Sequence, residues 1–181
     1  MQENKWADRL TMKRQGKDRF FREHPQSPIL PWERDAFQGL HYYPLDPSYR
    51  FELPLHEHDE KRLVTVEATH GGEREFIRWG EFRFMVGEEE CSLQAYRTDP
   101  GEERLFVPFR DETAASETYT KGRYLDLEPQ IHRTGNGRWV LDFNEAYNPW
   151  CEYSEDYVCP FAPEENWLKV TVPVGEKRYN S

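Results

Sequence analysis

Apolar positions are sparse at the start of the chain and recur there with a helical period. Four large apolar side chains fall near one stripe of a helical projection: Trp6, Leu10, Phe20 and Phe21. The residues between them are mostly good helix formers, and such a stripe is typical of a helix that buries one face. Pro25 sets the end of the run, because the residue before a proline avoids the α conformation. The pattern predicts an N-terminal helix over residues 1–24.

The next residues, 25–48, follow neither a helical nor an alternating period. This segment is rich in prolines and aromatic rings: Pro28, Pro31, Trp32, Phe37, Tyr42, Tyr43, Pro44 and Pro47. Proline favours extended backbone, and aromatic rings bury large apolar areas. We expect an extended arm that wraps the rest of the protein and is held in place by its rings.

From residue 49 to residue 181 the pattern changes to short β-type runs, separated by glycine, proline and charged turns. The runs cover residues 49–55, 63–69, 75–86, 91–97 and 105–109. Gly80, inside the third run, is expected to mark a bend or bulge. Short strands at regular spacing predict an antiparallel meander. The predicted fold is mainly β, an antiparallel β-barrel or sandwich in one domain of residues 1–181, with an N-terminal α-helix and a long C-terminal covering loop at 144–160.

A last hairpin is predicted from two runs on either side of a turn. Residues 123–133 and 138–144 flank Gly-Asn-Gly at 135–137, whose residues tolerate the positive φ of tight hairpins. In this hairpin Asp142 shares a face with Ile131 and has apolar neighbours. A carboxylate placed there needs hydrogen-bond donors or a cation, because an isolated buried charge costs several kcal/mol.

Composition limits the classes of partner. The 181 residues include 34 acidic and 24 basic side chains, which give a formal net charge of -10 at pH 7. This charge repels phosphate backbones and anionic lipid, and no basic run is long enough to reverse it locally. We therefore expect neither nucleic acid nor a membrane as a partner.

The cysteine content and the missing motifs narrow the picture further. Three cysteines, Cys91, Cys151 and Cys159, are an odd number that suits a reducing compartment. The first residues are charged, with no apolar run behind them to serve as a secretory signal, so we expect a cytoplasmic protein. The sequence has no nucleophile elbow, phosphate loop or dinucleotide fingerprint, and no cofactor is expected.

Polar chemistry is concentrated in two segments. The first offers a carboxylate-plus-amide set: Asp142, Asn144, Tyr147 and Asn148. The second places an arginine between carboxylates: Asp111, Thr113, Tyr119, Arg123 and Asp126. These groups are candidate ligand-binding residues, in which the guanidinium would hold an anion bidentately. The structural alternatives are turn capping for the first set and a salt-bridged sheet edge for the second.

Cys151 and Cys159 have three interpretations. Their spacing is not that of a zinc ribbon, although two thiolates can bind a metal if other ligands arrive from elsewhere. They can also form a redox-sensitive dithiol. The third interpretation is a pair of partly buried structural thiols, because cysteine behaves as a small hydrophobe.

Seven blocks of sequence carry a family resemblance. They are KDRFFREHPQSPI at 17–29, FQGLHYYPLDPSYRF at 37–51, FVPFRDET at 106–113, TYTKGRYLDLE at 118–128, LDFNEAYNPWCEY at 141–153, CPFAPEENWL at 159–168 and VPVGEKRY at 172–179. Together they resemble the family of domain of unknown function 1684 over nearly the whole chain. The chain departs from that family at Ala114-Ala115, where a glycine is expected, which weakens an anion-nest interpretation of this turn. The resemblance implies no established activity.

Three functional hypotheses follow. In the first, the protein binds a small polar or anionic ligand in a pocket under the loop at 144–160. In the second, a hydrolase- or lyase-type site uses Asp142 as acid or base, Arg123 as anion clamp, and Tyr153 or Cys151 as proton donor or nucleophile. In the third, a structural or partner-binding protein without a catalytic site uses its aromatic arm to hold a second subunit, as in a homodimer.

Overall fold

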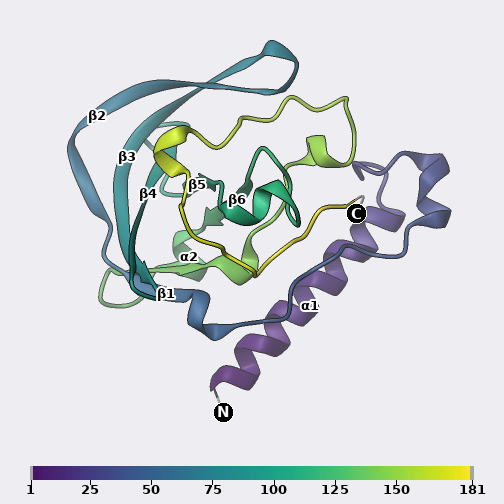
Figure 1. Ribbon diagram of the computed structural model, residues 1–181, viewed down its shortest axis with the longest axis horizontal. Coiled ribbons are helices and arrows are strands. Elements are labelled where there is room, and N and C mark those ends of the chain that lie inside the picture. Colours follow the sequence, from purple (N-terminus) through teal and green to yellow (C-terminus); the bar gives the residue numbers. More distant parts are fainter. Residues whose placement is uncertain (1, 180–181) are drawn as a thin grey trace.

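The computed structural model describes residues 2–179, which contain two α-helices and seven strands (Figure 1). The elements are α1 (Gln2–Glu23), β1 (Arg50–Leu53), β2 (His56–Glu67), β3 (Glu73–Val86), β4 (Glu89–Arg97), β5 (Leu105–Phe109), β6 (Arg123–Leu127), α2 (Pro129–His132) and β7 (Trp139–Asp142). Short 3-10 turns connect them. Among these residues no helix is both long enough and apolar enough to cross a bilayer.

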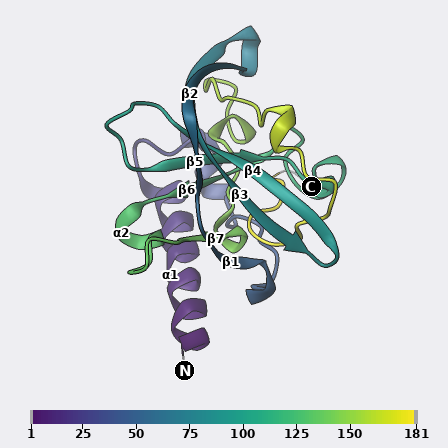
Figure 2. The same cartoon turned by 90° about the vertical axis from the view of Figure 1, so that its left-hand side faces the viewer.

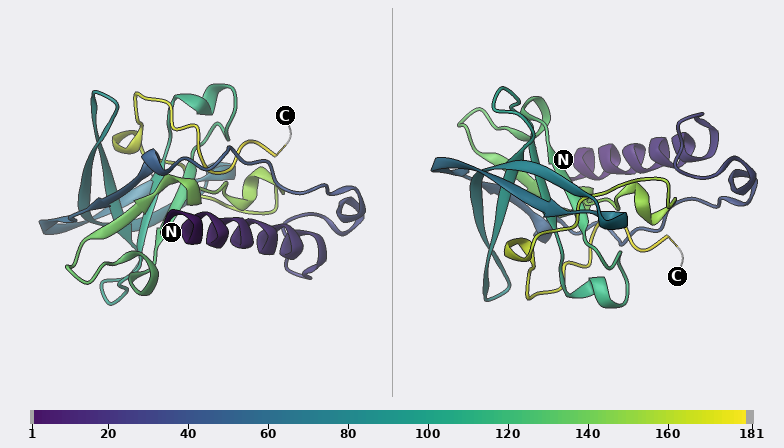
Figure 3. Two further views of the ribbon diagram at one scale, coloured as in Figure 1. Left: turned by 90° about the horizontal axis from the view of Figure 1, so that it is seen from below. Right: turned by 90° about the horizontal axis from the view of Figure 1, so that it is seen from above.

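Helix α1 confirms the helix predicted from the N-terminal pattern. It buries Leu10 and Phe21 at 1% exposure each and ends at Glu23, before His24 and Pro25. Figure 1 shows α1 along one side of the strands, and Figure 3 shows its C-terminal end and the following turn extending beyond them. The helix therefore adds a wall to one side of the β structure.

Five strands form one antiparallel sheet in the order β2-β3-β4-β5-β6 (Figure 2). Each strand pairs with its neighbour in sequence, as expected for a meander. The register of β3 against β4 shifts between Arg78 and Gly80, which confirms the bulge predicted there. A Cβ on Gly80 would lie 2.9 Å from the His56 carbonyl oxygen, so the bulge also needs a residue without a side chain.

The predicted last hairpin forms only beside its turn, where Arg133 and Trp139 make one antiparallel bridge, and the pairing predicted for the rest of its strands is wrong. Strand β7 pairs with β1, with Asp142 opposite Arg50, and not with β6. The chain leaves β6 through the short helix α2, which begins at Pro129 and carries it away from the sheet. Ile131 is 63% exposed on α2, whereas Asp142 is 1% exposed. The two residues therefore do not share a face.

The mainly β, antiparallel fold class is confirmed, and its strands are divided between the five-stranded sheet and the β1-β7 ribbon. Within residues 2–179 the hydrogen-bonded strand order does not close into a barrel. The main core lies between sheet and ribbon, where Phe82 and Leu125 meet Leu141 and Phe143. The final segment adds Val174 to this core.

A second apolar cluster joins α1, the arm and the C-terminal loop. It consists of Phe21, Ile29, Phe37 and Tyr153. Of the rings in the arm at 25–48, Phe37 and Tyr43 are buried and Trp32 is 76% exposed. The C-terminal loop is thus drawn against α1, which positions the candidate site.

Candidate functional site

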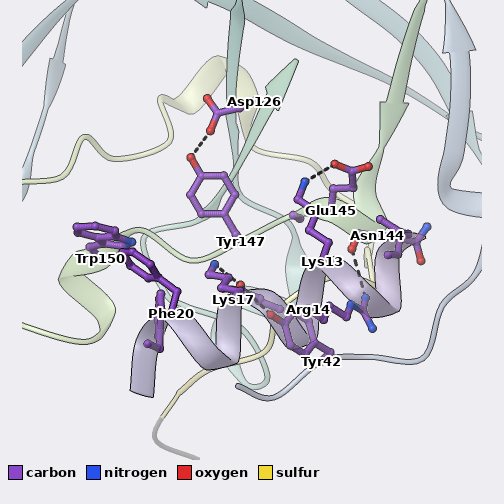
Figure 4. A pocket seen from close by; sticks show the side chains of 14 residues that line it. Lys13, Arg14, Lys17, Phe20, Tyr42, Asp126, Asn144, Glu145, Tyr147 and Trp150 are labelled. Carbon is purple, nitrogen blue, oxygen red and sulfur yellow. Dashed lines mark hydrogen bonds and ion pairs between the residues drawn. The ribbon is translucent and has the colours of Figure 1, made fainter. Parts of the chain in front are cut away.

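A cavity of about 360 Å³ lies between α1 and the start of the C-terminal loop (Figure 4). Its walls come from α1, the arm, β6, the segment after β7 and the chain end: Leu10, Lys13, Arg14, Lys17, Phe20, Phe21, Tyr42, Asp126, Asn144, Glu145, Ala146, Tyr147, Trp150 and Glu176. Of the predicted ligand-binding residues, three line it: Asp126, Asn144 and Tyr147. From the loop at 144–160 only residues 144–147 and 150 line the cavity, and α1 supplies much of the rest.

Three basic side chains of α1 line the cavity: Lys13, Arg14 and Lys17. They lie on the helix face that also buries Leu10 and Phe21, because residues three and four apart share a face. The Arg14 guanidinium donates to the backbone oxygens of Tyr43 and Asn144, at 3.1 and 3.2 Å. These two bonds hold α1 against the arm and the C-terminal loop.

Glu145 lies beside Lys13 and is held by two cations and a histidine. Its carboxylate oxygens are 3.0 Å from the Arg9 guanidinium, 2.6 Å from Lys13 Nζ and 3.3 Å from His132 Nε2. Burial opposes ionisation, but the hydrogen bond from His132 and the charge of Lys13 outweigh it and hold the pKa of Glu145 well below its usual range. Glu145 therefore stays ionised at neutral pH, and its charge holds the Lys13 side chain in place.

Glu176 is 1% exposed and reaches the cavity from the C-terminal segment. One oxygen pairs with Lys17, and the other accepts from Asn148 N at 2.7 Å and from the Tyr153 hydroxyl at 2.9 Å. Burial, followed by the Glu176 charge, raises the pKa of Tyr153 well above its usual value. Tyr153 thus keeps its proton and serves as a hydrogen-bond donor to a protein carboxylate.

Asp126 and Tyr147 form the wall opposite α1 in Figure 4. The Tyr147 hydroxyl donates to Asp126, and the Arg104 guanidinium lies 3.1 Å from the other Asp126 oxygen. Burial and the Asp126 charge raise the pKa of Tyr147 well above its usual value, so its hydroxyl stays protonated. This carboxylate, like the two others, is paired within the protein.

One end of the cavity is aromatic. The ring of Phe20 on α1 lies 6.4 Å from that of Trp150, and both are drawn together at one side of Figure 4. Leu10, Phe21 and Ala146 add further apolar surface. The cavity therefore combines a cationic helix face with an apolar end.

Asp142 does not line this cavity. Its carboxylate accepts from Trp6 Nε1 at 2.7 Å, from Asn144 N at 3.0 Å and from Asn144 Nδ2 at 2.9 Å, and Arg50 Nε lies 3.7 Å away. The expectation that this carboxylate has donors and a cation is confirmed. Asp142 caps the 3-10 turn that begins at Phe143, which is the capping alternative.

The predicted arginine clamp is also internal. Arg123 is buried and donates to Asp111 at 3.1 Å, to the Val172 and Glu176 carbonyl oxygens at 2.9 and 3.1 Å, and to the Val174 carbonyl oxygen. Asp111 accepts in addition from the Thr113 hydroxyl, at 2.8 Å, and from two backbone amides. The pair anchors the C-terminal segment to the sheet.

The remaining predicted residues lie around the cysteines and the chain end. Tyr119 hydroxyl is 3.4 Å from Cys151 Sγ, and Cys151 N donates to Cys159 Sγ at 3.3 Å. Asn148 Nδ2 donates to the Lys177 carbonyl oxygen at 2.7 Å. In the part of the chain that the structure describes, no three His, Cys, Asp or Glu side chains form a metal-binding group.

Sequence reasoning missed the basic face of α1 and its partners Glu145 and Glu176. A signal for the helix residues was present. Lys13, Arg14 and Lys17 occur between Leu10 and Phe21, where the helical period places more of the buried face. Cations on an otherwise buried face indicate a polar site. No local pattern connects them with carboxylates more than a hundred residues away.

Comparisons with known proteins identify the family. A family model described as "Protein of unknown function (DUF1684)" matches residues 35–177. The solution NMR structure of an uncharacterized protein from gene locus rrnAC0354 of Haloarcula marismortui is 40% identical, covers 97% of this chain and 96% of that chain, and superposes with a TM-score of 0.74. No curated protein matches the sequence. Since the family model spans most of the sequence, this chain belongs to the DUF1684 family of proteins of unknown function.

Proposed function

We propose that this protein binds a small anionic ligand that carries an apolar group, in the cavity between α1 and the loop at 144–160. The main support for this proposal is the set of three basic side chains, Lys13, Arg14 and Lys17, on the cavity wall of a protein whose net charge is -10. The lining as a whole holds three cations and three carboxylates, so an anion would be held by these helix cations directly and not by an excess of positive charge.

The arrangement of charges supports an anion. Each of the three lining carboxylates is paired with at least one cation of the protein, and the Glu145 side chain is 6% exposed, whereas that of Lys13 is 60% exposed. Arg9 and Arg104 add two further cations behind Glu145 and Asp126. In each ion pair of these carboxylates with Arg9, Lys13, Lys17 or Arg104, the basic side chain is the more exposed partner.

The size and the aromatic end support an apolar group on the ligand. Ligand cavities commonly measure roughly 300 to 1,000 Å³ and combine apolar walls with a few polar groups. The cavity of about 360 Å³ falls at the small end of that range. Phe20 and Trp150 offer ring faces, while Lys13 and Lys17 lie along the helix toward its other end. A ligand with a ring and an acidic group fits this division.

The first test uses phenyl phosphate followed by amide NMR, with phenol and inorganic phosphate as separate controls. We expect phenyl phosphate to shift the Trp150 indole and the amides of Lys13 and Lys17, and each half-molecule to bind more weakly. Shifts that are absent with phenyl phosphate at millimolar concentration, or scattered away from the cavity, would contradict the proposal.

A matched pair of variants sharpens this test. Lys13→Met removes one cavity cation, while Glu145 keeps Arg9 and His132 as partners. Lys5→Met makes the same charge change on the exposed part of α1 outside the lining. A lost charge-assisted hydrogen bond weakens binding by roughly tenfold. Only Lys13→Met should show it, and equal loss in both variants would indicate a general charge effect.

The other two hypotheses receive less support. The Asp142 carboxylate is used as a turn cap and lies outside the cavity, which removes the geometric basis for an acid or base there. In the arm, Phe37 and Tyr43 are buried within the chain, and Trp32 is 76% exposed. A single exposed ring provides little surface for holding a second subunit.

A further inference from the structure

Two cysteines lie close together in the C-terminal loop, where Cys151 is partly exposed and Cys159 is buried. Cys151 follows Trp150 in a 3-10 turn, and Cys159 lies near the end of the loop. The Cys151 amide donates to Cys159 Sγ at 3.3 Å. The chain folds back between them, so that the ring of Tyr157 packs against that of Trp150, with centroids 5.1 Å apart. The loop geometry therefore brings the two sulfur-bearing residues together.

The surroundings of the pair are polar on both sides. Tyr119 hydroxyl lies 3.4 Å from Cys151 Sγ. The Cys159 backbone is fixed to Thr69, whose hydroxyl accepts from Cys159 N at 3.0 Å and whose amide donates to the Cys159 carbonyl oxygen at 3.0 Å. Cys159 is thus anchored to Thr69, the second residue after β2, while Cys151 belongs to the 3-10 turn at Trp150–Glu152.

The two thiols differ in acidity. Hydrogen bonds from the Cys151 thiol and amide outweigh burial and lower the pKa of Cys159 to about 7. The interaction with Cys159, followed by burial, raises the pKa of Cys151. A thiolate at neutral pH beside a protonated thiol is the arrangement of an attacking and a resolving cysteine.

Cys91 provides a contrast within the same chain. It is buried on β4, where burial raises the pKa of its thiol. Its Sγ lies 3.8 Å from the Glu89 carbonyl oxygen. Cys91 and Cys159 are buried to a similar degree, at 7% and 8% exposure, so Cys91 serves as an internal control for a buried thiol that bonds to a backbone oxygen and not to a second cysteine.

We propose that Cys151 and Cys159 are a modification site, which a peroxide converts reversibly into an intramolecular disulfide. The Cys159 thiolate attacks one peroxide oxygen; the S–O bond forms, the O–O bond breaks, and the leaving hydroxide takes a proton to become water. Cys151 then attacks the sulfenic sulfur, forming the S–S bond; the S–O bond breaks and the released hydroxide takes the Cys151 proton. Two thiols are oxidised, and one peroxide is reduced to two waters.

The test uses the reduced full-length protein, hydrogen peroxide and a quench with N-ethylmaleimide. Trypsin leaves both cysteines in one peptide of residues 139–169, because no Lys or Arg interrupts it. The expected product is this peptide without maleimide and lighter by two hydrogens, while Cys91 carries maleimide. Cleavage after Glu152 and Glu155 should leave two fragments joined until a reductant is added. A peptide that keeps two maleimides, or equal oxidation of Cys91, would overturn the proposal.

Two variants assign the roles. In Cys151→Ser, peroxide should leave Cys159 as a sulfenic acid that dimedone traps. In Cys159→Ser, Cys151 should remain a thiol under the same conditions. Dimedone addition to Cys151 at the same rate would overturn the assignment of Cys159 as the attacking thiol.

The pH dependence of the rate of disulfide formation distinguishes attack by a thiolate from a purely structural thiol pair. Because the Cys159 thiolate fraction rises through a pKa of about 7, the rate should be roughly tenfold higher at pH 8 than at pH 6. A rate that does not change over this interval would contradict attack by Cys159. These measurements follow the cysteines alone and do not depend on ligand binding in the cavity.

Discussion

Two arginine-containing clusters in this protein look alike in sequence and differ in the structure. Arg123 lies among predicted ligand-binding residues, but its side chain is 1% exposed and its donors go to Asp111 and to backbone oxygens. Arg14 belongs to a helix that sequence reasoning treated as packing, yet it lines a cavity with Lys13 and Lys17.

The two clusters differ in whether their charged groups remain accessible to a ligand. The Arg123 cluster encloses its charges and uses them to hold the chain end against the sheet. In the α1 cluster the carboxylates Glu145 and Glu176 are enclosed, and the lysines stay partly exposed, at 60% for Lys13 and 25% for Lys17. Residue type alone does not show whether an arginine or lysine is enclosed in a structural ion pair or partly exposed in a cavity wall.

The largest expected effect is that of Arg123→Met. Removing one partner of a buried ion pair typically costs about 3 to 5 kcal/mol, because the other charge stays buried. The substitution also releases the carbonyl oxygens of Val172 and Glu176. Urea unfolding should show this loss, while Arg19→Met on the exposed side of α1 changes stability little. A loss below about 1 kcal/mol would remove the structural role of the cluster.

Glu145→Gln should lower the free energy of unfolding at neutral pH by roughly 2 to 3 kcal/mol, through lost charge-assisted bonds. The folded pKa of Glu145 is lowered, so the unfolded state binds more protons between the two pKa values. Its contribution is therefore present above a pH of about 4.3 and is lost as the pH falls. Between pH 2.5 and 6, the free energy of unfolding should change more with pH in the wild type and in exposed Glu23→Gln than in Glu145→Gln. Equal slopes in all three proteins would contradict the pairing.

Asp142→Asn tests the turn cap against a catalytic carboxylate. Asp142 accepts hydrogen bonds through both carboxylate oxygens, whereas Asn has one oxygen and one NH2 group. In the variant, either Trp6 Nε1 or Asn144 N therefore faces that NH2 group and loses its acceptor. We expect a destabilisation of about 1 to 2 kcal/mol by thermal unfolding, and no change in exposed Asp8→Asn. An increase in stability would favour a strained functional carboxylate instead.

The smallest expected effect is stabilising. Gly16 lies in the interior of α1, and a Cβ there meets no atom within 4 Å. Gly16→Ala should therefore raise the free energy of unfolding by roughly 0.5 to 1 kcal/mol, without changing ligand binding. Gly175→Ala is the opposite control, because its φ is 79° and its Cβ would lie 2.8 Å from the Phe143 carbonyl oxygen. Stabilisation by both substitutions would contradict the described geometry.

Much of the fold was predictable because it depends on local patterns. The helical stripe ending before Pro25, the short antiparallel strands and the bulge at Gly80 each follow from periodicity or from one residue's backbone freedom. The last hairpin failed for a nonlocal reason. Its turn at 135–137 exists, with Thr134 N donating to the Arg138 oxygen at 2.8 Å, but β1 takes the place of the partner strand. A turn signal fixes a reversal of the chain and not which strand lies beside it.

The candidate site was predictable in part. The first residues of the loop at 144–160 line a cavity, and Asn144, Tyr147 and Asp126 are among the lining residues. Asp111, Thr113 and Arg123 were grouped correctly, but they form a buried anchor. Whether a polar residue caps, anchors or lines a cavity depends on what covers it, and this information is distributed over distant segments.

The sequence by itself determined the helix, the β class and the need of Asp142 for partners, because backbone propensity and the cost of burying charge act on short segments. Only the tertiary structure decided that α1 lies against residues more than a hundred positions away. That contact paired Lys13 with Glu145 and Lys17 with Glu176, and it left a cavity with cations at its edge. The physical reason for this contact is the burial of Leu10 and Phe21. The hydrophobic effect is not directional, so the sequence around these two residues does not indicate which distant segment will cover them.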